Sequence, residues 1–414
     1  MHLTRIVTLF TTILLPGTIA ADWYESAPVN YSKSEARTPL TELRDAIEQG
    51  SIVFEPGNDR KSLQQVLDHL EVPVESQVLV YSKTSFQISH IYPGRPRAIF
   101  YGDNAYVGWV PGGLIEVTTF DPELGAVFHV VRLPGHGSEK LPKIVRDRTC
   151  LQCHGDAGSN GVPGVMVRSV FPSVSGHPLT RAGSFLTTHS SPLEERWGGW
   201  YVTGFTGGAG HMGNAVFEES EDGEFDLKKL TAEPTRNLEE VIDGELYPAG
   251  PQSDIAALMV LEHQVTVHNA LVHGNLTTRR MLHLDRALKS ISDEDGDAPL
   301  GDIYRHAIES EADKIVRAIL FADEVELDGD GIEGRDDFVE AFQKNARPGP
   351  KDHSLKDLRL YRRLFKYRCS YLIYCDAFTE LPEPLKGMVL TRLHGILTKP
   401  EDHPDFDYLR ERSS

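Results

Sequence analysis

The segment "RTCLQCHGDAG" at residues 148–158 combines residue types that can do chemistry. Cys150 and Cys153 are separated by two residues, and His154 follows the second cysteine directly. This C-x-x-C-H pattern is the attachment signature of c-type haem. Two thiols at this spacing can add across the two vinyl groups of one porphyrin, and the adjacent histidine supplies the proximal iron ligand. The pattern predicts one covalently bound haem c with its iron on His154.

A C-x-x-C pair by itself also occurs in redox dithiols and in zinc sites. A zinc site needs a second pair at similar spacing, which the remaining cysteines, Cys369 and Cys375, do not offer. A redox dithiol usually opens a helix in a thioredoxin-like βαβ context, and the surrounding sequence lacks one. The motif occurs once, which disfavours di-haem peroxidases and multihaem electron carriers. These comparisons favour the haem interpretation.

The first residues predict export. A short basic start, "MHLTR", precedes an apolar stretch over residues 6–20 that ends in small residues suited to a signal peptidase. We therefore predict a signal peptide over residues 1–21 that is removed in the mature protein. An uncleaved anchor is the alternative, but the apolar run is short for a membrane span and contains Pro16. Because haem c is attached after export, the signal peptide agrees with the motif, and we expect a periplasmic or otherwise exported protein with no membrane span after cleavage.

The amino-acid composition limits the classes of binding partner that we expect. The 414 residues include 61 acidic and 42 basic side chains, for a formal net charge of −19. Such a chain repels the phosphate backbone, so nucleic acid is not an expected partner. We expect instead a periplasmic redox partner with a basic docking patch, since complementary charge accelerates association. The 40% apolar content is enough for a sizeable globular core.

The N-terminal half is predicted to be strand-rich. Residues 22–75 contain two amphipathic helical segments, "PLTELRDAIEQG" and "RKSLQQVLDHL". Residues 77–132 are rich in Val, Ile, Phe and Tyr between Gly and Pro turns, which is typical of an antiparallel sheet. Further strand-like segments follow the motif: "GVMVRSVFP", "GSFLTTHSS" and "GGWYVTGF". The motif therefore lies on a loop or short helix inside a predicted haem domain over residues 22–216.

The C-terminal half is predicted to be helical. Residues 217–252 are acidic and rich in Pro and Gly, which is typical of a surface linker. The helical region over 253–414 begins at a Ser253-Asp254 cap. Further helices are predicted near residues 299–324, 335–346, 354–379 and 384–398. Within the third of these, Cys369 and Cys375 would be separated by about 9 Å of helix rise, which is too far for a disulfide.

The sixth position of the iron decides the function, since a second strong ligand makes an electron carrier and an open position makes an enzyme or a sensor. The first candidate is His263, which projects from an apolar helical stripe between Met259 and Val267. His268 points about 140° away on the same helix and belongs to a packing face. The alternative is Met212 in the Gly-rich loop "TGGAGHMGN", where His211 is a further candidate. An open position also remains.

Several long stretches resemble a known group. They include "PRAIFYGDNAYVGWVPGG", "CLQCHG", "GVPGVMVRSVFP", "SPLEERWGGWYVTG", "DIAALMVLEHQ" and "RRLFKYRCSYLIY". They are similar to exported, largely uncharacterised bacterial proteins described as cytochrome c domain proteins, and the resemblance spans most of the mature chain. It implies a c-type haem and an export route, but no substrate and no distal ligand.

Together these patterns predict an α+β protein with a strand-rich, haem-bearing N-terminal half and a helical C-terminal half. The predicted function is electron transfer in the periplasm through one covalent haem. The alternatives are a periplasmic haem enzyme, either peroxidase-like or acting on a small redox substrate, and a haem-based sensor subunit.

Overall fold

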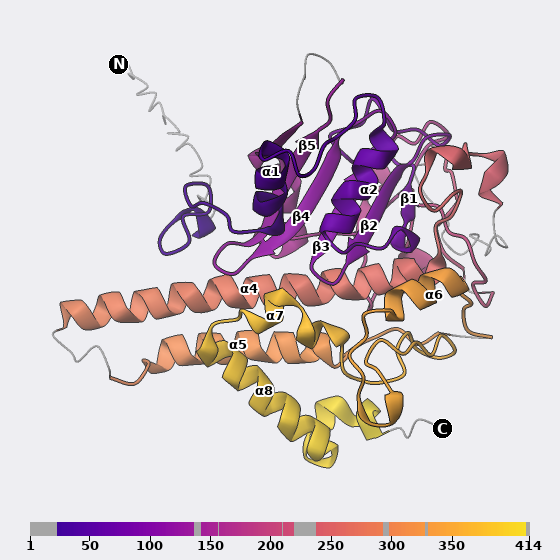
Figure 1. The fold of residues 1–414 in the computed structure, drawn as a ribbon. Coiled ribbons are helices and arrows are strands. Elements are labelled where there is room, and N and C mark those ends of the chain that lie inside the picture. Colours follow the sequence, from indigo (N-terminus) through magenta and orange to yellow (C-terminus); the bar gives the residue numbers. More distant parts are fainter. Residues whose placement is uncertain are drawn as a thin grey trace, which may run out of the picture.

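The computed structural model describes residues 23–135, 142–155, 157–208, 210–218, 237–292, 298–327 and 330–410. The predicted signal peptide and residues 219–236 of the predicted linker lie outside these described residues. An antiparallel sheet occupies the N-terminal half and helices dominate the C-terminal half (Figure 1). The predicted α+β fold class is confirmed.

The main sheet has six strands in sequence order, each antiparallel to the next. The strands are β1 Val78–Val80, β2 Arg97–Gly102, β3 Ala105–Trp109, β4 Ile115–Asp121, β5 Gly125–Arg132 and β6 Lys143–Arg146. Five of them lie within the predicted 77–132 sheet. The sixth, "KIVR", is short and charged at both ends, so the sequence pattern did not predict it.

Two amphipathic helices cover one face of this sheet: α1 Pro39–Glu48 and α2 Asp59–His69 (Figure 1). The predicted stripe of α2 is buried, with Leu63, Val66 and Leu67 in one core cluster together with residues of the sheet. The side chain of Asn58 caps α2 by accepting a hydrogen bond from the backbone N–H of Lys61. Both predicted N-terminal helices are confirmed.

The opposite face of the sheet packs on α4, Ile255–Ile291, a helix of 37 residues (Figure 1). Asp254 caps it as predicted, accepting from the Ala257 N–H at 3.0 Å. By length and composition α4 could cross a membrane, but 83% of its most apolar window is buried inside the protein. That burial is typical of the core helix of a globular protein.

The remaining helices extend the core around α4. They are α5 Asp302–Ile319, α6 Asp336–Gln343, α7 Asp376–Thr379 and α8 Glu383–Thr398. α5 and α8 lie on the far side of α4 from the sheet (Figure 1), whereas α6 contacts the turn at Val74–Ser76 and α7 contacts β4. α5, α6 and α8 correspond to the predicted helices near 299–324, 335–346 and 384–398.

The predicted helix over 354–379 was wrong. Only a 3-10 turn at Tyr371–Tyr374 and the short α7 are helical there. Leu358 pairs with Phe365 as in a hairpin, and Leu360 has a φ of 57°, which no α-helix accommodates. Cys369 and Cys375, which were predicted to lie on this helix, are both free thiols in the structure.

The segments around the predicted linker also differ from expectation. Of the three strand-like segments after the motif, two form a hairpin, β7 Arg168–Val170 with β8 Ser184–Leu186. The third contributes only isolated bridges, such as Trp200 with Val80 at the edge of the main sheet. Residues 237–252 of the predicted linker are not a simple tether, because Leu238, Ile242 and Tyr247 are buried in the core under α2.

Candidate functional site

The C-x-x-C-H motif forms one helical turn. A 3-10 turn over Arg148–Cys150 leads directly into α3, Leu151–His154. The Asp147 carboxylate caps this 3-10 turn. It accepts hydrogen bonds from the Thr149 backbone N–H at 2.9 Å and from the Thr149 hydroxyl at 2.6 Å. Because residues three apart are neighbours on a helix surface, Cys150 and Cys153 lie on the same side. Both thiols are free, Cys153 exposed and Cys150 partly buried.

A hydrogen bond fixes the ring of His154. Its Nδ1 lies 2.9 Å from the carbonyl oxygen of Gly164. A carbonyl can only accept, so Nδ1 carries a proton and donates it to Gly164. An Nδ1–H anchored in this way by a backbone carbonyl is common in histidines that bind a metal through Nε2.

The loop that supplies this carbonyl is itself held by α4. The side-chain amide of Asn269 accepts from the Val165 N–H at 3.0 Å and donates to the Val165 carbonyl at 2.6 Å. A Cβ at Gly164 would lie 2.6 Å from Asn269 Oδ1 and 2.9 Å from the Ser159 side chain, so only glycine fits there. α4 therefore positions His154 indirectly, through Gly164.

The Cys150–His154 turn lies beside the face of the main sheet that α4 partly covers. The His154 and Phe128 ring centroids are 4.9 Å apart, and Phe128 pairs with Thr118 in the β4–β5 ladder. Glu116 lies two residues along β4 from Thr118, so it points to the same face. Its carboxylate is 2.5 Å from the Arg97 guanidinium, with the two side chains 19% and 24% exposed. This part of the sheet face carries charge and is open to solvent.

Burial and these charges shift the pKa of the Cys150 thiol. Burial and, to a smaller extent, the carboxylates of Asp147 and Glu116 raise its pKa to about 12, and the Arg97 cation opposes them. The charges of the Arg97–Glu116 pair therefore act at the position of Cys150. A free thiol at this position is protonated at neutral pH.

Comparison with known proteins found no family model, no curated protein and no solved structure that matches this chain. The candidate site is therefore argued from its own geometry. Among the described residues, no group of three or more His, Cys, Asp and Glu side chains converges on a possible metal position.

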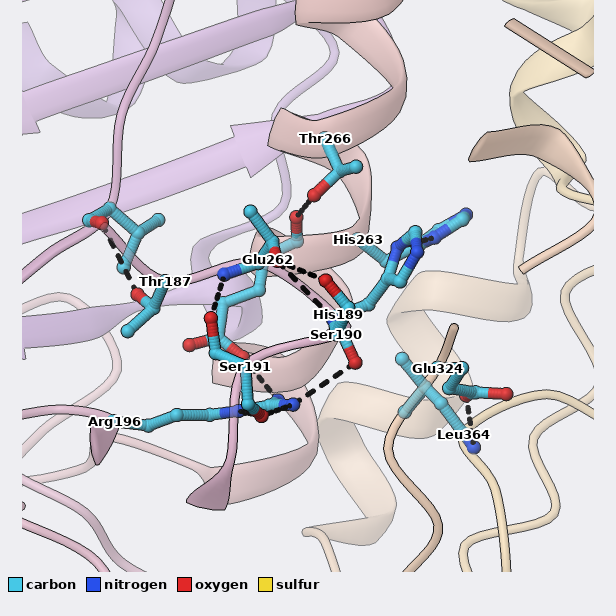
Figure 2. A network of polar contacts seen from close by, with 12 residues as sticks. Thr187, His189, Ser190, Ser191, Arg196, Glu262, His263, Thr266, Glu324 and Leu364 are labelled. Atoms are coloured by element: carbon cyan, nitrogen blue, oxygen red, sulfur yellow. Dashed lines mark hydrogen bonds and ion pairs between the residues drawn. The ribbon is translucent and has the colours of Figure 1, made fainter. Parts of the chain in front are cut away.

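His263, the first distal candidate, lies fully buried in the core of the helical half. Its Nδ1 is 3.2 Å from His189 Nδ1, and its Nε2 is 2.8 Å from the Ser370 hydroxyl (Figure 2 shows both histidines). His189 Nε2 lies 3.2 Å from the Ala322 carbonyl and must donate to it, which leaves His189 Nδ1 to accept from His263 Nδ1–H. Ser370 then donates to His263 Nε2. Both nitrogens of His263 are thus occupied by protein, which does not support its role as an iron ligand.

Aromatic rings enclose His263 on several sides. Its ring stacks on Phe321 with centroids 4.2 Å apart, and Phe365 and Tyr371 lie near it. Burial lowers the pKa of His263 well below its ordinary value. His268 behaves as predicted for a packing face: Tyr106 lies 2.7 Å from its Nδ1, and its ring packs on Phe120.

Beside His263, the sequence analysis missed a buried ion pair. Arg196 and Glu262 are 2.7 Å apart and both almost fully buried. Arg196 also donates to the carbonyls of Ser191 and His189 (Figure 2). Burial raises the pKa of Glu262 to about 7, against the lowering effect of Arg196. A charged residue inside the apolar run "ALMVLEHQV" was the available sign of this pair.

Met212 and His211 are also buried. The Met212 sulfur accepts from the Ser169 hydroxyl at 3.5 Å. His211 packs edge-on against Trp197 at 5.3 Å, and burial lowers its pKa to about 4. Within the described residues, the hydrogen-bond and ring partners of Met212, His211 and His263 all lie outside the Cys150–His154 turn. The structure therefore brings Cys150, Cys153 and His154 together on one turn, while His263, His211 and Met212 make their described contacts in the protein core.

Proposed function

We propose that the Cys150–His154 turn carries one covalent haem c and that the protein transfers single electrons after export. The observation that carries this proposal is the hydrogen bond from His154 Nδ1 to Gly164, made while two free thiols project from the same helical turn. A zinc site or a redox dithiol does not require that arrangement, whereas a thioether-linked haem uses all three side chains at once.

The residues of the turn fit the group. Cys150 and Cys153 would form the two thioethers, and His154 would hold the iron through Nε2, since Nδ1 donates to the Gly164 carbonyl. Haem supplies a one-electron couple between ferric and ferrous iron. Gly164 and Asn269 keep the His154 ring in a fixed orientation, which limits its reorganisation during electron transfer.

Covalent attachment is tested by the colour of the purified mature protein. We expect the haem to stay with the protein in acid acetone and to give a c-type pyridine haemochrome. Cys150→Ala and Cys153→Ala should each weaken or abolish attachment, whereas Cys369→Ala, which removes a free thiol outside the motif, should leave it intact. Release of the pigment into the solvent would overturn the proposal.

The second candidate function is a haem that binds an external ligand, as in an enzyme or a sensor. The occupied contacts of His263 and Met212 favour this candidate, because neither side chain is free to take the sixth position. Carbon monoxide distinguishes the two functions. Rapid binding to the ferrous protein indicates an open site, and no binding indicates a carrier with a strong sixth ligand.

The redox partner follows from the net charge of −19. We propose a soluble periplasmic protein that presents a basic patch. Its association rate with this protein should then fall as salt is added, since charge steering is screened beyond about 10 Å at 0.1 M salt. A rate independent of salt would exclude electrostatic docking.

A further inference from the structure

We infer that the Arg97–Glu116 ion pair tunes the reduction potential of the haem, and that Glu116 is the stronger contributor. The inference rests on the proposed function, because it concerns the same site and adds residues that the haem motif does not contain. It comes from the register of the sheet together with the contacts of His154.

The register places Glu116 next to the iron ligand. His154 contacts Phe128, and Phe128 pairs directly with Thr118 on β4. Glu116 is the next residue along β4 on the same face, and therefore a diagonal neighbour of Phe128. One aromatic side chain thus separates the carboxylate from the His154 ring along the sheet.

Arg97 reaches this place from two strands away. It lies on β2, and its guanidinium crosses β3 above Gly108 to reach Glu116 on β4. A Cβ at position 108 would lie only 2.3 Å from the guanidinium, so a larger residue there would displace the Arg97 side chain. Glycine in a strand interior often marks a place where another group approaches closely, and Gly108 is such a place for Arg97.

The pair is not needed to fill the core. Its side chains are 24% and 19% exposed, and the Glu116 carboxylate also accepts a hydrogen bond from the Ser85 hydroxyl at 3.3 Å. A charged pair held beside a partly open surface adds little stability. Polar isosteres should therefore be tolerated at both positions, and a change in potential can be separated from unfolding.

Electrostatics gives the sign of each effect. Reduction passes one electron from an external donor to ferric iron, forms and breaks no covalent bond, and lowers the charge of the site by one. A nearby anion stabilises the more positive ferric state, and a nearby cation stabilises the ferrous state. The Glu116 carboxylate therefore lowers the potential, and the Arg97 guanidinium partly cancels that effect.

The test is a mediated dithionite titration of the haem in the full mature protein. Glu116→Gln leaves the Arg97 cation unopposed and should raise the potential by about 59 mV, which is a tenfold change in a one-electron equilibrium. Arg97→Gln leaves the anion unopposed and should lower the potential. The double variant Arg97→Gln/Glu116→Gln should lie between the two single variants and slightly above wild type, because the carboxylate contributes more than the guanidinium.

Glu309→Gln is the matched control, because Glu309 forms a comparable pair with Arg305 on α5, on the other side of α4 from the sheet. It should leave the potential unchanged. Shifts of the same sign in both single variants, or no shift in either while thermal unfolding shows an intact fold, would overturn the inference and leave haem attachment standing. A wild-type protein without covalent haem would instead overturn the proposed function, and this inference with it.

Discussion

His154 and His263, the predicted proximal and distal ligands, have opposite surroundings. His154 is partly buried and is anchored through one ring nitrogen by a backbone carbonyl, beside a charged and partly open sheet face. His263 is fully buried and bonded through both nitrogens. A histidine that binds a metal commonly has its other ring nitrogen anchored by a carbonyl, as Nδ1 of His154 is. The ring of His263 is instead held at both nitrogens by side chains of the core.

The same helix produces this contrast. Near its start, α4 carries Glu262 and His263, which bond to Arg196, His189 and Ser370 and close the core. About two turns later, the Asn269 side chain bonds to the backbone of Val165, in the loop that carries Gly164. The apolar sequence of α4 does not distinguish the two regions. They differ because other segments of the chain bring different side chains and backbone groups to each of them.

The largest expected effect is on the free energy of unfolding, through the buried Arg196–Glu262 pair. Arg196→Met removes the cation from a fully buried pair and should lower the free energy of unfolding by about 3–5 kcal/mol. Denaturant unfolding measures this change. The double variant Arg196→Met/Glu262→Leu should recover most of the loss, since no buried charge remains. Arg305→Met, which breaks an exposed pair, should cost less than about 1 kcal/mol. Equal costs for the two single variants would contradict a closed core.

The next expected effect separates the two histidines directly. His263→Ala leaves His189 and Ser370 without their partner and opens a cavity against Phe321, so the free energy of unfolding should fall by about 3 kcal/mol. The absorption spectrum of the proposed haem should stay unchanged. His154→Ala should alter that spectrum, because it removes the proposed proximal ligand. A high-spin ferric spectrum with new carbon monoxide binding in His263→Ala would instead support His263 as the sixth ligand.

The smallest expected effect is a pH dependence of stability. Burial lowers the pKa of His189 to about 4, below its ordinary value of 6.5. The unfolded chain therefore binds a proton between pH 6.5 and 4 that the folded protein does not, so stability falls as the pH falls through this range. His189→Gln should make the slope shallower by about 1.4 kcal/mol per pH unit. His306→Gln, at an exposed position, serves as the control, and an unchanged slope in His189→Gln would exclude a neutral buried His189.

The sequence predicted those features that depend on residues close together in the chain. The C-x-x-C-H spacing identified Cys150, Cys153 and His154, and the Ser253-Asp254 pair marked the start of α4. Periodic apolar residues located α1 and α2. Each signal lies within one or two turns of helix, where local geometry leaves few alternatives.

The features that the sequence did not predict depend on contacts between distant segments. Strand register brings Arg97 and Glu116 together, and nothing in either segment specifies that register alone. The segment over residues 354–379 has enough apolar residues for a helix, but Phe365 and Tyr371 are drawn into the cluster around His263, and the backbone follows them. Tertiary contacts override local propensity at such places.

The contact between Asn269 and Val165 spans 104 residues of sequence. The six strands of the main sheet are consecutive hairpin neighbours and can pair soon after they emerge, whereas α4 joins them only by closing a long loop. Because the Cys150–His154 turn and Gly164 precede α4 in the chain, they are synthesised before the helix that later fixes them. The orientation of the His154 ring is therefore set late in folding, when α4 packs against the sheet and Asn269 holds the loop that carries Gly164.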